Sequence, residues 1–207
     1  MKKWFFVLFF ALPVYGGPLE DAGLQDVSQV LGNKVFIRLR YATDNNFTGK
    51  KIYDFDKCYL HKDAIAGLQT AVALAAQADT PFTFCLWDCY RPQEMHLKLW
   101  QAFSNASYVA SPKRGSRHSR GMAVDLTPCD FNGNPLEMPT DFDTFTPKAH
   151  MDNFDSPAKL LRRRALLKKI MEQAGFSHTR TEWWHFDKKG WKQKPLLNVP
   201  VGSGLAK

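Results

Sequence analysis

The chain has 207 residues, of which 44% are hydrophobic and 23% charged, a composition typical of a globular protein with one substantial core. Its formal net charge is +8, but no basic stripe interleaved with aromatic residues and no nucleic-acid-binding motif accompanies that charge. The composition therefore excludes a disordered chain and gives no support for a nucleic-acid partner. We interpret the excess charge as a solvated basic surface.

The first 17 residues are typical of a signal peptide. Lys2 and Lys3 form a positive amino-terminal region, and an apolar run over residues 4–14 follows. The run is too short to span a bilayer as a conventional helix, although an uncleaved anchor is the alternative. We therefore expect residues 1–17 to be removed on export and residues 18–207 to form one periplasmic domain without membrane insertion.

Four cysteines suit an exported protein, because disulfides persist in oxidising compartments. Cys85 and Cys89 lie on one predicted strand, about 13 Å apart, which is too far for a bond between them. Any bridge should therefore join one of these two to Cys58 or Cys129, and the pairing stays open. The spacing of the cysteines matches no zinc cluster, so we do not count them as ligands.

Hydrophobic periodicity predicts the elements in chain order. Residues 19–33 are expected to form a short turn or helix after the leader. Residues 34–41 alternate between apolar and basic side chains, which predicts a half-buried strand, and residues 45–49 form a loop. Residues 64–76 are rich in alanine with apolar residues at helical spacing, which predicts a helix.

The aromatic-rich residues 82–89 predict a buried strand. Pro92 suits the first turn of a helix, which the apolar stripe continues over residues 93–103. Arg91 then lies at a strand-to-helix junction. We expect its side chain to reach a site from there without being buried.

Residues 105–117 form a loop rich in Ser, Pro and Gly, and the alternating residues 121–127 predict a strand with one apolar face. The long irregular stretch over residues 128–155 is expected to be a wall or lid of a site, because long loops in compact domains are usually functional. Ser156 is predicted to cap a basic amphipathic helix over residues 158–174.

The three arginines Arg162, Arg163 and Arg164 are expected on the solvated face of that helix. Residues 183–187 predict a last strand, and residues 188–207 form a polar tail. Helices interleaved with antiparallel strands predict an α+β fold. We expect a single domain with a small, mainly antiparallel sheet flanked by helices.

Two distant segments carry side chains that can hold a metal. His118 and Asp125 lie seven residues apart, and Asp125 is on a predicted strand. The small residues Gly121 and Ala123 precede it and would leave room for a closely fitting ion. About sixty residues later, His185 supplies a second imidazole.

Two imidazoles and one carboxylate, from His118, Asp125 and His185, suit one catalytic zinc ion per chain with one open position. Glu182, three residues before His185, would be the general base. Either half alone is more commonly structural, whereas the two together favour a zinc site. The spacing differs from the helical His-Glu-x-x-His motif, so the ligands should lie on strands and strand ends at the sheet face.

The motifs resemble those of a known family. The pattern Ser116-x-His118-x-x-Gly121-x-Ala123-x-Asp125, followed by Glu182-x-Trp184-His185, resembles the signature of the zinc D,D-peptidases. Residues 41–49, 58–64 and 87–92 are similar to the D-alanyl-D-alanine dipeptidase branch. The resemblance covers nearly everything after residue 25. It implies an α+β fold and hydrolysis of the dipeptide D-alanyl-D-alanine to two D-alanines, with a D,D-carboxypeptidase acting on peptidoglycan stem peptides as the alternative.

The resemblance also implies roles for residues outside the metal site. Arg91 would stabilise the oxyanion together with the metal, and Asp88 would orient Arg91. A non-catalytic zinc-stabilised module that binds cell-wall peptides would need neither Glu182 nor Arg91. Cys89 departs from the pattern, since a smaller residue is expected there.

For the substrate, the resemblance implies groups that bind both ends of a dipeptide. Asp143 matches the acid that binds the ammonium group, with Asp141 as the fallback. Ser116 resembles the part that binds the carboxylate, and Tyr41 is expected to line the pocket. The sequence leaves the oligomeric state and the physiological role open.

Overall fold

A five-stranded mixed sheet lies at the centre of the computed structural model, which describes residues 17–202. In spatial order its strands are β2 (Val35–Ile37), β4 (Thr83–Asp88), β5 (Ala123–Cys129), β7 (His185–Lys188) and β6 (Phe176–His178). The pair β2–β4 is parallel and the other three pairs are antiparallel. The predicted α+β domain with a mainly antiparallel sheet is confirmed, whereas the predicted signal peptide lies outside the described residues except for Gly17.

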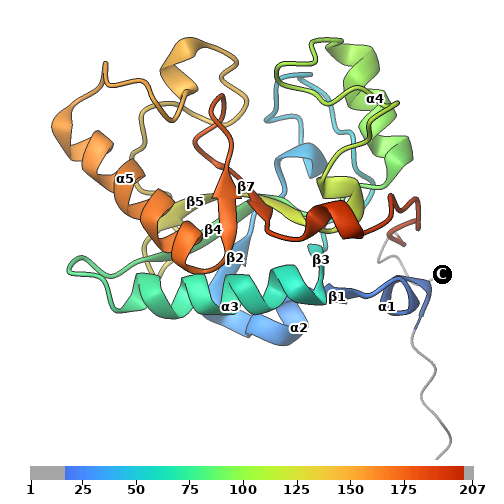
Figure 1. Ribbon diagram of the computed structural model, residues 1–207, viewed down its shortest axis with the longest axis horizontal. Coiled ribbons are helices and arrows are strands. Elements are labelled where there is room, and N and C mark those ends of the chain that lie inside the picture. The colour runs from blue at the N-terminus through green and yellow to red at the C-terminus, as the bar shows by residue number, and fades with distance from the viewer. Residues whose placement is uncertain (1–16, 203–207) are drawn as a thin grey trace, which may run out of the picture.

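Helices and a small ribbon surround this sheet. The helices are α1 (Pro18–Asp21), α2 (Val27–Leu31), α3 (Lys62–Ala76), α4 (Gln93–Ala102) and α5 (Ala158–Gln173). Strands β1 (Leu24–Asp26) and β3 (Tyr59–His61) form an antiparallel ribbon. Short 3-10 helices are η1 (Gly32–Lys34), η2 (Arg40–Ala42), η3 (His118–Arg120), η4 (Pro147–Ala149) and η5 (Trp191–Gln193). In Figure 1, α3 runs below the sheet, while α4 and the segment around residues 130–155 lie above it.

The two central strands are buried along their whole length. Val124 and Leu126 of β5 join the hydrophobic core, whereas Asp125 between them lines a cavity. The predicted division of this strand into an apolar face and a face with a carboxylate is therefore correct. Helix α3 buries its apolar stripe, including Ile65 and Leu68, which confirms the helix predicted from periodicity.

The structure corrects three local predictions. The strand predicted over residues 34–41 ends at Ile37, because the side chain of Tyr41 turns into the core and the backbone bends there into η2. Helix α5 begins after Pro157, and the hydroxyl of Ser156 donates to the carbonyl of Asp155 instead of capping the helix. Strands β1, β3 and β6 were not predicted, since three residues are too few for a visible alternation.

One disulfide joins Cys58, before β3, to Cys89, just after β4. This pairing satisfies the expectation that Cys85 or Cys89 would bind Cys58 or Cys129. The bond closes a loop across a sequence separation of 31 residues. The resulting loss of entropy in the unfolded chain stabilises the folded state by about 3–4 kcal/mol. Cys85 and Cys129 remain buried thiols. Between residues 17 and 202, no helix is long and apolar enough to cross a membrane.

Arg164 lies on the buried side of α5, so its predicted place on the solvated face is wrong. Only 3% of Arg164 is exposed, and its guanidinium donates to the carbonyls of His150, at 2.9 Å, and Asn153. Those carbonyls belong to the long segment over residues 128–155, where the carbonyl of His150 also accepts from the backbone N–H of Asn153. Arg164 therefore fastens this segment to α5, while Arg162 stays exposed as predicted.

We expect Arg164→Ala to lower the free energy of unfolding by about 2–3 kcal/mol, because the carbonyl of Asn153 loses its donor and the carbonyl of His150 keeps only the backbone N–H of Asn153. The same substitution at the exposed Arg162, two positions earlier, should change it by less than about 0.5 kcal/mol. Urea denaturation followed by circular dichroism measures both. Equal effects of the two substitutions would contradict the anchoring role of Arg164.

Candidate active site

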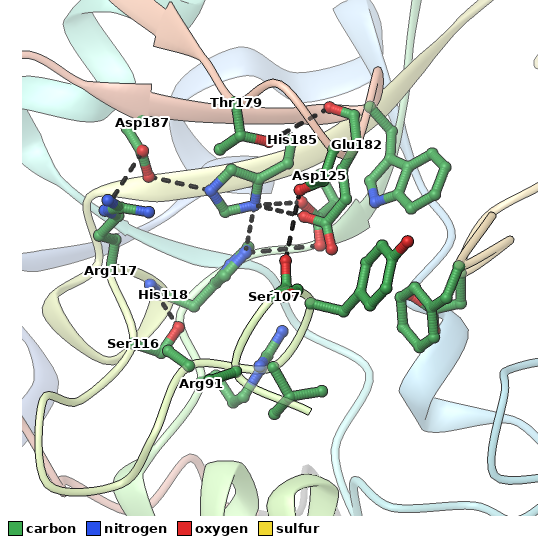
Figure 2. A pocket seen from close by; sticks show the side chains of 18 of the residues that line it. Arg91, Ser107, Ser116, Arg117, His118, Asp125, Thr179, Glu182, His185 and Asp187 are labelled. Atoms are coloured by element: carbon green, nitrogen blue, oxygen red, sulfur yellow. Dashed lines mark hydrogen bonds and ion pairs between the residues drawn. The ribbon is translucent and has the colours of Figure 1, made fainter. Parts of the chain in front are cut away.

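Three elements bring two imidazoles and a carboxylate together. His118 lies in η3, Asp125 in β5 and His185 at the start of β7, and all three are buried. Asp125 and His185 are directly paired across the two strands. Nδ1 of His185 is 2.8 Å from Oδ1 of Asp125 and 3.2 Å from Nε2 of His118 (Figure 2). The same Nε2 of His118 is 3.4 Å from Oδ2 of Asp125.

The outer nitrogen of each ring identifies its tautomer. Nδ1 of His118 lies 2.8 Å from the carbonyl oxygen of Cys89, which can only accept, so this nitrogen carries the proton. Nε2 of His185 lies 2.9 Å from Oδ1 of Asp187 and donates to it. In neutral rings the two inner nitrogens therefore carry lone pairs that face each other and a carboxylate.

Such a group of three donors is stable only around a cation or a proton. Ligands about 2.0–2.1 Å from a tetrahedral ion are separated by about 3.3 Å from one another, close to the separations of these atoms. The donors of His118, Asp125 and His185 all lie within 4.8 Å of one another. The residues therefore fit a divalent metal ion held by two nitrogens and one oxygen.

The carboxylates and imidazoles also shift the pKa values of one another. Burial alone would raise the pKa of Asp125, but the two imidazoles hold it well below its usual range. Burial would lower the pKa of His185, but the carboxylates of Asp187 and Asp125 raise it well above its usual value. The site thus binds positive charge strongly, and a metal ion would compete there with a proton.

Gly121 has a different purpose from the one that the sequence suggested. Its φ is +63°, and a Cβ atom there would lie 2.4 Å from Cδ2 of Leu24 and 2.9 Å from the backbone nitrogen of His61. The missing side chain therefore allows the turn after η3 to pack against the β1–β3 ribbon, and does not make room for an ion. Ala123 is paired across the sheet with Asp187.

Glu182 lies just before β7, next to the three residues His118, Asp125 and His185, which we call the metal-binding group. Its Oε2 is 3.9 Å from Nδ1 of His185, and 13% of its side chain is exposed. Burial raises the pKa of Glu182 to about 7, and the nearby carboxylate of Asp125 adds to this effect while His185 opposes it. A carboxyl group with this pKa can exchange a proton near neutral pH.

Arg91 lines the same cavity, but it is buried, contrary to the prediction from its position at the end of a strand. Its Nε lies 3.1 Å from Oδ2 of Asp88 and 3.2 Å from the hydroxyl of Tyr53, and Nη2 is 2.5 Å from the same Oδ2. Its Nη1 contacts His96, and its guanidinium lies over the ring of Tyr41. The burial is tolerated because these partners satisfy the charge.

The contact that was predicted between Asp88 and Arg91 is thus present. Asp88 has no exposed surface, and its other oxygen accepts from the hydroxyl of Tyr53 at 2.8 Å. The backbone N–H of Arg91 donates to the carbonyl of His118. This bond places the end of β4 directly beside η3, so that the guanidinium and the metal-binding group face one cavity.

The residues predicted to bind substrate divide into two groups. Asp143, Tyr41 and Ser116 line the cavity, whereas Asp141 is exposed and pairs with Arg40 at 3.0 Å. Oδ2 of Asp143 accepts from the hydroxyl of Tyr41 at 2.9 Å. Burial, with help from the other carboxylates of the site, raises the pKa of Asp143 well above its usual value.

Asp143 is held in a strained backbone conformation. Its φ is +54°, and among residues 17–202 no other non-glycine residue has a positive φ. Such strain tends to occur where a side chain must be aimed at a site. Ser116 also lines the cavity, and its hydroxyl accepts from the backbone N–H of His118 at 3.2 Å.

The cavity encloses about 360 Å³. Residues 106–110 and Asp143 with Phe145 contribute to its walls, so the long segment over residues 128–155 does form part of a wall, as predicted. The loop over residues 105–117 contributes more of the lining than expected.

Sequence reasoning missed several polar residues around the site. Asp187 follows His185 by two positions on one strand, a spacing that puts both side chains on the same face and could have revealed it. Nε of Arg117 forms an ion pair with the second oxygen of Asp187 at 3.3 Å (Figure 2). The guanidinium of Arg117 also lies over the ring of Trp191. His96 gave no sequence signal.

The site combines a buried group of two histidines and one aspartate with a glutamate whose pKa is raised to about 7. This combination is typical of hydrolases that use one metal ion. The comparisons with known proteins agree. The model of the peptidase M15 family, described as D-Ala-D-Ala dipeptidase, matches residues 20–200, so the chain belongs to this family of metallopeptidases.

Curated relatives carry the same description. The chain is 40% identical over 161 residues to the D-alanyl-D-alanine dipeptidase of Escherichia coli (strain K12), covering 78% of this chain and 82% of the relative. It is 31% identical over 171 residues to that of Enterococcus faecalis (71% and 82% covered) and 33% identical over 171 residues to that of Streptomyces coelicolor (72% and 84% covered). The family predicted from the motifs is confirmed.

Removing Asp88 should destabilise the fold, since Arg91 would become a buried charge without its partner. We expect Asp88→Ala to lower the free energy of unfolding by about 3–5 kcal/mol, and Arg91→Met in the same chain to restore part of it. Asp141→Ala, which removes an exposed aspartate paired with Arg40, is the matched control and should cost no more than about 1 kcal/mol. Chemical denaturation distinguishes these outcomes, and similar losses at both aspartates would show that Asp88 does not compensate the buried charge of Arg91.

Proposed function

We propose that this chain is an exported, zinc-dependent dipeptidase that hydrolyses D-alanyl-D-alanine to two D-alanines. One observation carries the proposal. A metal-binding group, a carboxyl group with a pKa near 7 and a buried arginine line a single cavity of about 360 Å³. Membership of the D-Ala-D-Ala dipeptidase family supports the choice of substrate.

His118, Asp125 and His185 would hold the metal, and zinc is the ion that such a set of nitrogen and oxygen donors most commonly binds in hydrolases. When bound, zinc supplies a Lewis acid that polarises the substrate carbonyl and makes water more acidic. The proton on Nδ1 of His118 and that on Nε2 of His185 are held by Cys89 and Asp187, which keeps the inner nitrogens free for the metal.

Glu182 is proposed as the general base. Its carboxylate is 3.9 Å from the inner nitrogen of His185, so it lies beside the position where a nucleophilic water would attack. It would accept the proton of that water and later donate it to the leaving amine. A raised pKa suits both steps, because the group must bind and release a proton in one turnover.

Arg91 is proposed to stabilise the oxyanion that forms at the scissile carbonyl. Asp88 and Tyr53 occupy one edge of its guanidinium, which leaves N–H groups for the reacting oxygen. Because the partners are fixed before the substrate binds, little reorganisation is needed during the reaction. The charge acts in a buried site, where it is screened weakly.

The two ends of the dipeptide would be bound by different residues of the cavity lining. Asp143 is proposed to bind the ammonium group, with Tyr41 holding its carboxylate in place. Ser116 and its neighbouring backbone are proposed to bind the carboxylate of the substrate. The cavity lies at the lower end of the range of roughly 300–1,000 Å³ for small-molecule sites, which favours a dipeptide over a peptidoglycan stem.

We further propose that residues 1–17 are a signal peptide and that the catalytic domain, residues 18–207, acts in the periplasm. The basic start and the apolar run of the first segment support export. The disulfide between Cys58 and Cys89 supports an oxidising compartment.

The purified protein loaded with zinc should release D-alanine from D-alanyl-D-alanine and leave the L,L isomer intact. Glu182→Gln should lower kcat by roughly 10²–10⁴-fold while the metal content stays the same, because the ligands are untouched. Coupled detection of D-alanine and elemental analysis measure the two quantities. Faster release from a pentapeptide stem than from the dipeptide would favour the D,D-carboxypeptidase, and undiminished turnover in Glu182→Gln would remove the assigned base.

The rate should also depend on pH near neutrality. Glu182 accepts a proton only when ionised, and burial raises its pKa to about 7, so kcat/KM should begin to fall at some pH below about 7. A bound cation favours the ionised form and would move the midpoint toward the ordinary glutamate value of about 4.3. Metal content measured at each pH separates protonation of the base from loss of the ion. A rate that stays constant down to the ordinary glutamate value would contradict the prediction.

A further inference from the structure

A buried histidine outside the metal-binding group connects Arg91 to the cavity wall. His96 lies in the first turns of α4 and is 1% exposed. Its Nδ1 is 3.2 Å from Nη1 of Arg91, and its Nε2 is 2.8 Å from the carbonyl oxygen of Ala110. Ala110 belongs to residues 106–110, which line the cavity.

The two contacts determine the tautomer of His96. The carbonyl of Ala110 can only accept a hydrogen bond, so Nε2 carries the proton. The guanidinium of Arg91 can only donate, so Nδ1 must present a lone pair to it. The ring is therefore neutral, in agreement with its pKa, which burial and the adjacent charge of Arg91 lower to about 4.

This contact fixes the part of Arg91 that Asp88 leaves free. Oδ2 of Asp88 accepts from Nε and Nη2, so it holds one edge of the guanidinium. His96 accepts from Nη1 at the other end of the plane. With both ends held, one N–H on each terminal nitrogen remains for a ligand in the cavity.

We propose that His96 is a positioning residue for Arg91, with Ala110 selecting the tautomer that makes this possible. His96 acts through the arginine and not on the substrate, and it ties the orientation of the guanidinium to the wall formed by residues 106–110. The inference rests on the role of Arg91 in the proposed function. It assigns to α4 a part in that function.

Two substitutions, each reproducing the position of one ring nitrogen, allow the two contacts of His96 to be removed one at a time. Asn places its amide near the position of Nδ1, so His96→Asn keeps an acceptor for Arg91 and loses the donor to Ala110. Gln reaches the position of Nε2, so His96→Gln keeps the donor to Ala110 and loses the acceptor for Arg91. Both side chains are polar and smaller than or similar in size to the ring, so each variant serves as the control for the other.

On D-alanyl-D-alanine we expect His96→Gln to lower kcat by roughly 10–100-fold with little change in KM, because a misplaced donor weakens transition-state stabilisation. His96→Asn should recover most of that loss. In an Arg91→Ala chain, His96→Gln should lower kcat no further, since the residue through which it acts is gone. Equal losses in the Asn and Gln variants, or an undiminished loss in the Arg91→Ala chain, would overturn the inference.

Wild-type turnover and the loss expected on Arg91→Ala test the proposed function separately. If both hold while the two His96 variants fail to differ, the inference alone is wrong. If Arg91→Ala retains full activity, the role of Arg91 fails and the inference with it. A measurement that needs no folded variant is nitrogen-15 NMR of the histidines of the whole chain at neutral pH. It should show His96 as the neutral Nε2–H form, and a charged ring or an Nδ1–H form would overturn the proposal.

Discussion

One electrostatic constraint governs this structure: two imidazole lone pairs and a carboxylate must share a buried space. The pairing of β5 with β7 places Asp125 opposite His185, and η3 brings His118 to the same point. The outer nitrogen of each ring donates its proton to an acceptor, the carbonyl of Cys89 or the carboxylate of Asp187. Neither neutral ring can therefore place a proton on its inner nitrogen to relieve the repulsion. The sheet therefore builds a site whose charge balance is completed by a cation.

The sequence was most informative where one chemical requirement determines a residue type or where a periodic pattern is long. Helix α3 was predicted because many residues repeat one spacing, and strand β4 because a short run is rich in aromatic residues. The metal-binding group was recognised because His118, Asp125 and His185 combine donor types that suit one ion, and the structure brings these three side chains together. Of the two candidate acids in the long segment, Asp143 reaches the cavity and Asp141 does not.

The remainder depended on tertiary partners that no local pattern records. The burial of Arg91 follows from Asp88 and from His96 on the next helix, and the burial of Arg164 follows from the carbonyls of His150 and Asn153. Gly121 was read as space for an ion, whereas the ribbon that packs against it is distant in sequence. Local spacing identifies chemistry, but burial is decided by which distant segments supply hydrogen-bond partners.

The disulfide includes the residue that orients one imidazole of the site. The same Cys89 that bonds to Cys58 offers its carbonyl to His118, so a covalent crosslink holds the backbone that orients a ring of the metal-binding group. A chain that folds before its thiols are oxidised would hold that backbone by noncovalent contacts alone. The redox state of Cys58 and Cys89 is therefore linked through one backbone carbonyl to the orientation of the His118 ring.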